Sequence, residues 1–131
     1  MKLEVARLNI VLSYLLKQMR EMNDDRDLPM KWSIMHMYSS TQLACLSAIK
    51  VGLNPELAGL IACMHDLGTI MTGKAENHAI SAAPFVKELI KKYNEELRYD
   101  LYVITVEETS IILEAIKSNN DKGNYTNSPY V

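Results

Sequence analysis

His65 and Asp66 are adjacent at the end of an apolar helical pattern and are followed by Leu67 and Gly68. Consecutive helical residues diverge by about 100°, so an imidazole nitrogen and a carboxylate oxygen at these positions leave a wedge that one divalent cation fits. His36, on the preceding predicted helix, is the candidate to close this wedge from a packed neighbour. These residue types therefore predict coordination of a divalent metal ion by His36, His65 and Asp66.

A structural role is the competing interpretation, because a single histidine in an apolar helix is more often a hydrogen-bonded core residue than a ligand. The position of Asp66 favours the metal. A carboxylate near a helix C-terminus meets the negative end of the helix dipole, and a cation would offset both that repulsion and the cost of desolvation. The residues alone leave both interpretations open.

Two amphipathic helices are expected in the first half of the chain. Leucines and a methionine recur at helical spacing from Lys2 to about Met22, and a second helix runs from about Trp32 to Val51 before Gly52, a C-terminal cap. His36 lies in the first turns of this second helix. Its face continues through Ser39, Ser40 and Leu43, a strip of mostly small side chains that another helix is expected to approach closely.

A third helix is expected from Leu57 to Leu67, opened by the N-cap Asn54 and by Pro55. Little of its surface is polar, so it should be the central and most buried helix. Gly68 is expected to end it. The following segment, 69–77, is then a loop that leaves the His-Asp pair near solvent.

The second half of the chain predicts two further helices. One runs from His78 to Tyr93, with Pro84 either as a kink or as the start of the helix proper, and residues 95–103 favour neither helix nor extended structure. The last helix opens at a capping box, Thr105 followed by Glu108, and ends near Asn119 before an irregular tail. The predicted fold is all-α: a single-domain bundle of about five helices over residues 1–131.

Composition excludes several classes of function. The net charge of −2 over 131 residues offers no broad cationic surface, so general nucleic-acid binding is not expected. No stretch approaches the ~20 apolar residues of a membrane-spanning helix, so no membrane association is expected. Cys45 and Cys63 have neither zinc-site nor disulfide spacing, which favours buried reduced thiols in a cytoplasmic protein.

The chain has His36 within one helix, the adjacent His65 and Asp66 about thirty positions later, and His78 after a short loop. This order resembles the HD-domain superfamily of metal-dependent phosphohydrolases, and the resemblance extends from about Trp32 to Lys122. The resemblance implies that His36, His65 and Asp66 bind a divalent cation, with Asp66 also catalytic. Manganese, iron, zinc, nickel and cobalt all suit mixed imidazole and carboxylate ligation. The implied activity is hydrolysis of a nucleotide or another small phosphate ester by a metal-bound water.

Three further residues are secondary candidates. Relatives place an additional histidine near His78 that binds a second metal or the substrate phosphate, and Lys74 is a weaker candidate for the phosphate. The resemblance departs where relatives have a His-Ser pair and this chain has Asn119, and a distal aspartate of the family has no counterpart up to Val131. Asp121 is the candidate substitute ligand. The alternative function is a degenerate, non-catalytic HD-fold module that binds a nucleotide or a partner protein.

The sequence also leads us to expect a homodimer. Without the helix that carries the family's distal aspartate, the apolar faces of the helix 57–67 or of the segment 111–116 should be partly uncovered. Exposed apolar patches beyond a few hundred Å² usually mark a contact, and a symmetric dimer covers one with a single self-complementary surface.

Overall fold

A computed structural model describes residues 4–22, 29–72 and 78–120, without the side chains of 78–81 and 119–120. The described part of the chain is helical apart from short connections. The elements are α1 (Ala6–Arg20), α2 (Met30–Val51), α3 (Pro55–Met64), α4 (Leu67–Thr72), α5 (His78–Lys92), the π-helical segment η1 (Tyr93–Leu97) and α6 (Val106–Asn120). The predicted all-α fold is confirmed, with α4 as a short additional helix.

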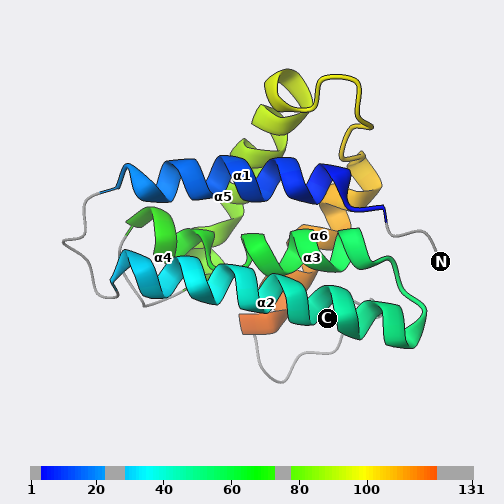
Figure 1. Cartoon of the computed structure of the whole chain (residues 1–131), viewed down its shortest axis with the longest axis horizontal. Helices are drawn as coiled ribbons and strands as arrows, with labels where there is room; N and C mark the ends of the chain where they lie inside the picture. The colour runs from blue at the N-terminus through cyan, green and yellow to red at the C-terminus, as the bar shows by residue number, and fades with distance from the viewer. Residues whose placement is uncertain (1–3, 23–28, 73–77, 121–131) are drawn as a thin grey trace.

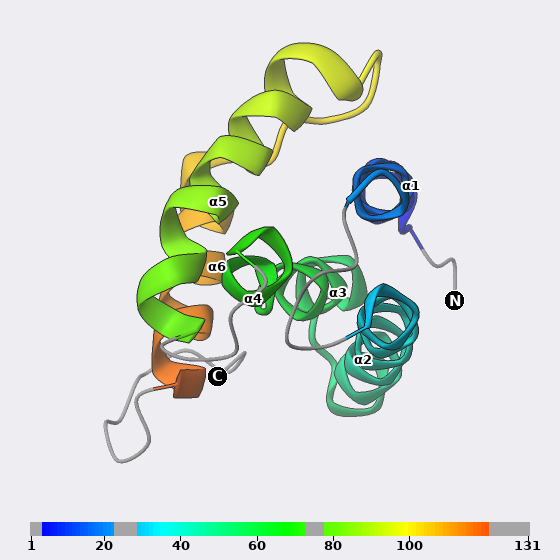
Figure 2. The same cartoon turned by 90° about the vertical axis from the view of Figure 1, so that its left-hand side faces the viewer.

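The helices α3 and α4 form the centre of the bundle. Helices α1 and α2 lie on one side of them, and α5 and α6 lie on the other (Figures 1 and 2). Leu60, Met64 and Leu67 are fully buried at this centre. The expectation that the third helix is the most buried one therefore agrees with the structure, because apolar side chains on several of its faces all meet neighbouring helices.

Helix α2 has the predicted length and ends at Gly52, whose φ of 79° is the left-handed conformation that glycine adopts without strain. Its packing differs from the expectation. The side that meets the rest of the bundle carries Met37, Thr41 and Ala48, whereas Ser39 and Leu43 are exposed. The strip of small residues beyond His36 therefore does not receive the neighbouring helix, since the buried residues of α2 lie about 100° round the helix from that strip.

Helix α3 starts as predicted, because the Asn54 side chain accepts hydrogen bonds from the backbone N–H groups of Glu56 and Leu57 at 2.9 and 3.3 Å. Its end was predicted wrongly. Helix α3 stops at Met64, the chain turns at positions 65 and 66, and α4 begins at Leu67. Gly68 is a buried residue of α4 and does not cap α3. Residues 69–72, expected as a loop, are helical.

An ion-pair network ties α1 to α3 and α6. The Arg7 guanidinium donates to Glu56 at 2.6 Å and to both carboxylate oxygens of Glu108 at 2.7 and 2.8 Å. A second oxygen of Glu56 accepts the Arg7 backbone N–H at 2.9 Å, which satisfies a free donor in the first turn of α1. Sequence patterns do not reveal this network, because its three residues are about 50 positions apart.

The C-terminal helices follow the prediction closely. Helix α5 contains Pro84, and α6 opens with the reciprocal capping box, in which Thr105 and Glu108 bond each other's backbone N–H groups at 3.0 Å. The apolar faces that we expected to be partly uncovered are mostly covered, with Ile61 and Ile111 partly buried against the core. Leu57 and Leu60 on α3, and Ile112 and Ile116 on α6, are buried within the bundle. None of the described helices is long and apolar enough to cross a membrane.

Candidate metal centre

Helix α2 and the turn between α3 and α4 bring His36, His65 and Asp66 together. One Asp66 oxygen, Oδ2, lies 3.0 Å from Nε2 of His36 and 3.1 Å from Nε2 of His65. One ligand atom from each of the three residues lies within 4.8 Å of the other two. The two imidazole rings are tilted by 59°, with their centres 5.9 Å apart, and the Nε2 atom of each faces the same carboxylate oxygen.

The backbone orients the His65 ring. Its Nδ1 atom contacts the carbonyl oxygen of Ala62, and because a carbonyl only accepts, Nδ1 carries the proton. In the neutral imidazole, Nε2 then presents a lone pair toward Asp66 Oδ2. Two electron-rich atoms 3.1 Å apart repel each other unless a proton or a cation lies between them. A carbonyl on one ring nitrogen and a metal on the other is the arrangement typical of metal-binding histidines.

The spacing of the donors fits a single ion. Two ligands that each bind a tetrahedral zinc at 2.0–2.1 Å are separated by about 3.3 Å. The observed nitrogen-to-oxygen distances of 3.0 and 3.1 Å are close to that value. Small movements of side chains would therefore complete such a site, and the partial exposure of all three residues leaves them room to move.

The turn changes the electrostatic setting of Asp66. We expected its carboxylate at the negative end of a continuous helix. In the structure, α3 has already ended, and the Asp66 carbonyl accepts the Ile70 N–H at 2.9 Å in the first turn of α4. Asp66 therefore lies between the negative end of α3 and the positive end of α4, so the helix dipoles largely offset each other there.

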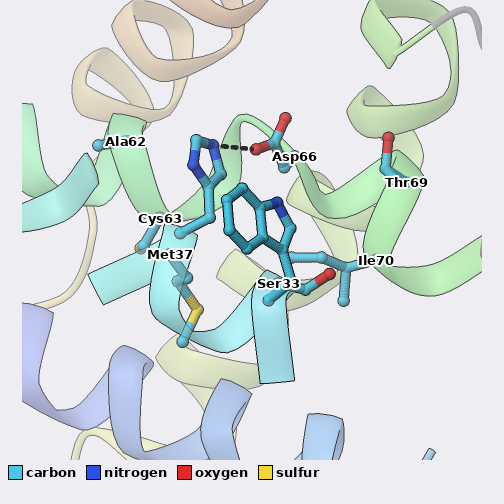
Figure 3. Close-up of a pocket in the computed structure, with 9 residues that line it drawn as sticks. Ser33, Met37, Ala62, Cys63, Asp66, Thr69 and Ile70 are labelled. Atoms are coloured by element: carbon cyan, nitrogen blue, oxygen red, sulfur yellow. Dashed lines mark ion pairs between the residues drawn. The ribbon is translucent and has the colours of Figure 1, made fainter. Parts of the chain in front are cut away.

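A pocket of about 310 Å³ is lined by two of the three residues, His36 and Asp66. Figure 3 shows Ser33 and Met37 contributing from α2, and Thr69 and Ile70 contributing from α4, and a dashed line marks the ion pair that Asp66 makes with His36. The lining is mainly apolar with a few polar groups, and the volume is at the lower end of the range for small-molecule sites. The remaining lining residues are Trp32, Ala62 and Cys63.

Cys63 lines this pocket but is not a suitable metal ligand. Its side chain is almost completely buried, and that burial raises the pKa of the thiol well above its usual range. Its Sγ donates to the carbonyl of Leu60 at 3.3 Å. The thiol therefore stays protonated at neutral pH, whereas metals bind the thiolate.

The secondary candidates fall outside what the structure describes. Lys74 and Asp121 are not among the described residues, and of His78 only the backbone is described, at the start of α5. Our reading of the sequence missed the pocket residues Trp32 and Thr69. Trp32 lies four residues before His36 and Thr69 lies three residues after Asp66, so helical periodicity was the available signal.

The chain matches the family model of the HD domain over residues 34–129. Comparisons with curated proteins and with solved structures gave no match. The family match covers well over half of the chain and includes His36, His65 and Asp66, the three residues that the fold brings together. The protein belongs to the HD-domain family, whose members are in general metal-dependent phosphohydrolases.

Proposed function

We propose that this protein is a metal-dependent phosphohydrolase that acts on a nucleotide or another small phosphate ester. The observation that carries the proposal is the convergence of His36, His65 and Asp66 within 4.8 Å beside a pocket. Three protein ligands are the number that catalytic zinc sites use, since a fourth position must stay open for the reactants.

Each of the three candidate ligands has a distinct role in the proposed site. His36 and His65 offer neutral nitrogen donors from two different elements, and Asp66 supplies the negative charge that balances a cation. The Ala62 carbonyl holds the His65 ring in the tautomer that leaves Nε2 free. A divalent cation held there would lower the pKa of a bound water toward neutrality and polarise a phosphoryl oxygen.

The pocket supports the substrate class. Its apolar wall, formed by Trp32, Met37 and Ile70, would cover the organic part of the ester while the phosphate lies toward Asp66. Lys74 and His78 remain proposed contacts to the phosphate or to a second metal ion, and Asp121 remains a proposed substitute ligand.

Elemental analysis after purification without chelators, followed by a screen of phosphate esters with added Mn²⁺, tests the proposal. We expect about one divalent ion per chain and hydrolysis of at least one ester. Asp66→Asn and His36→Ala should lower metal content and turnover to less than about a tenth, because each removes a direct ligand. Asp100→Asn, at an exposed position outside the site, is the matched control and should leave both unchanged.

Two outcomes would contradict this proposal in different ways. Bound metal without turnover on any ester would favour the non-catalytic HD-fold module. Absence of metal, or metal content unaffected by Asp66→Asn, would remove the metal site itself and leave the three residues as a hydrogen-bonded structural cluster.

A further inference from the structure

Helix α2 exposes its largest apolar side chains. Trp32, Met35, Leu43 and Leu46 have 58%, 66%, 67% and 57% of their surfaces accessible. The opposite side of the helix, which carries Met37 and other buried residues, packs against the bundle. Figure 2 shows α2 at the edge of the molecule, with its neighbours α1 and α3 on one side only. We call the four exposed side chains the α2 stripe.

The stripe is symmetric about one small residue. Trp32 and Leu46 lie seven positions before and after Ser39, and Met35 and Leu43 lie four positions before and after it. At 100° per residue, all five positions fall within an arc of about 80°. Ser39 is itself exposed, at the centre of the stripe. A helix face with this symmetry matches itself when a second copy is turned end to end.

We propose that this protein forms a symmetric dimer in which α2 packs antiparallel against α2 of a second copy, with the two-fold axis passing beside Ser39. Trp32 then faces Leu46 of the second copy, and Met35 faces its Leu43. The small Ser39 at the crossing point lets the two backbones approach closely. This is a self-complementary interface of the kind that closes after two copies.

Charge favours the antiparallel arrangement. The only charged residues of α2 are Lys31 and Lys50, one at each end of the helix. A parallel pair would place Lys50 beside Lys50 of the second copy, close to the stripe, and would align the two helix dipoles. In an antiparallel pair, each lysine is far from the same lysine of the second copy. The two helix dipoles then point in opposite directions, which is favourable.

The area of the stripe is sufficient for a stable dimer. Large apolar side chains present about 150–250 Å² when fully exposed, so the four exposed fractions correspond to roughly 370–620 Å² of apolar surface per copy. A standard interface buries about 800 Å² per partner, of which about 56–65% is apolar, or roughly 450–520 Å². The apolar side chains of one helix therefore supply what such an interface needs.

The proposed interface borders the pocket. Trp32 belongs both to the stripe and to the pocket lining, and His36 lies three positions from the two-fold axis. In this antiparallel pair, Gln42 of the second copy lies opposite His36 along the helix axis. Leu46 of the second copy covers the exposed side of Trp32. The second copy thus forms an outer wall beside the metal centre. The dimer itself rests on exposure and spacing and does not depend on the proposed catalytic activity.

Sedimentation velocity from about 1 to 100 µM tests the dimer on the full chain. We expect the wild-type mass to double across this range, and Leu43→Glu with Leu46→Glu to raise the dissociation constant by at least about 30-fold. Both leucines are exposed, so circular dichroism and thermal unfolding should show an intact fold. Val51→Glu, which is exposed on α2 but lies outside the stripe, is the matched control and should leave the dimer intact.

A disulfide trap tests the two-fold axis. At helix separations of 8–10 Å, the two Cα atoms at position 39 are about 3.4–5.4 Å apart, which overlaps the disulfide range at the larger separations. In a Cys45→Ser background, Ser39→Cys should therefore cross-link rapidly on mild oxidation. Ser47→Cys, also exposed on α2, lies about 24 Å from its own copy along the helix axis and should not.

The proposal fails if the wild type stays monomeric at 100 µM, which would indicate that another partner covers the stripe. It also fails if the double glutamate variant still dimerises, because the contact would then lie elsewhere. Equal cross-linking of the two cysteine variants would contradict the antiparallel two-fold arrangement. None of these results depends on metal content or phosphatase activity.

Discussion

Asp66 contacts both histidines through the same oxygen, so at the scale of single residues this carboxylate decides whether a cation can be held. The two imidazoles approach this carboxylate from different elements, His36 from α2 and His65 from the turn after α3. His65 is oriented by the Ala62 carbonyl of α3, whereas His36 is half exposed, and its Nε2 lies 3.4 Å from the Ser40 hydroxyl as well as 3.0 Å from Asp66. The His36 ring is therefore the one free to adjust when an ion binds.

The fluorescence of Trp32, the single tryptophan of the chain, should change when a metal ion binds. Trp32 lines the pocket beside His36 and Asp66, so Mn²⁺ or Co²⁺ bound there should quench its fluorescence through close contact. A titration should saturate near one ion per chain, and Asp66→Asn should abolish the saturable phase while Asp100→Asn preserves it. Quenching that persists in Asp66→Asn would place the ion elsewhere.

The two cysteines should differ in reactivity. Cys63 is almost fully buried, and burial raises the pKa of its thiol far more than that of the half-buried Cys45. An aromatic disulfide reagent at pH 8 should therefore modify one thiol in the folded protein and both after denaturation. Cys45→Ser should remove the fast reaction. If Cys63 reacted equally fast, the pocket wall would have to open readily.

At the scale of elements, the buried pairing of Arg7 with Glu56 and Glu108 holds three helices together. Hydrogen bonds from Arg7 lower the pKa of the Glu108 carboxyl below its usual value near 4.5. A carboxyl whose pKa is lower in the folded state contributes stability that is fully present above its unfolded pKa and is lost as pH falls through the folded one. The contribution of Glu108 therefore operates at neutral pH and disappears in acid.

Replacing Glu108 should expose this dependence. Glu108→Gln should cost about 1.5–3 kcal/mol at pH 7, because a charged acceptor of three hydrogen bonds is lost. The difference from wild type should shrink as pH falls below about 4. Urea unfolding at several pH values measures both effects, and the exposed neighbour Glu107→Gln is the control, expected to stay within about 0.5 kcal/mol of wild type. A pH-independent difference would mean that packing, not charge, is what Glu108 supplies.

At the scale of the whole molecule, the core joins residues from every described helix around α3 and α4. Val86 on α5 is fully buried in it, whereas Val51 at the end of α2 has 69% of its surface accessible. Val86→Ala should reduce the free energy of unfolding by about 1.5–3 kcal/mol, through lost burial and the cavity left behind. Val51→Ala should change it by less than about 0.5 kcal/mol. Chemical denaturation of both variants checks this, and equal effects would contradict the described packing.

The sequence by itself determined the five longer helices, except for the end of α3, and it determined several caps and the identity of the candidate ligands. Local chemistry is sufficient for these features: Asn54 caps α3, Gly52 ends α2, and Thr105 and Glu108 open α6, each through neighbours within a few residues. His65 and Asp66 could also be recognised from the sequence, because the two residues are adjacent. Such short-range rules act before any packing is known.

Only the tertiary structure decided where the chain turns and which faces are covered. The break after Met64 and the helical Gly68 follow from packing of α4 against α5, and local propensity does not contain that information. On α2 we expected the strip beyond His36 to meet the neighbouring helix, yet the side that is buried carries Met37, Thr41 and Ala48. His36 lies about 30 positions before His65 and Asp66 and meets them only because α2 packs against α3.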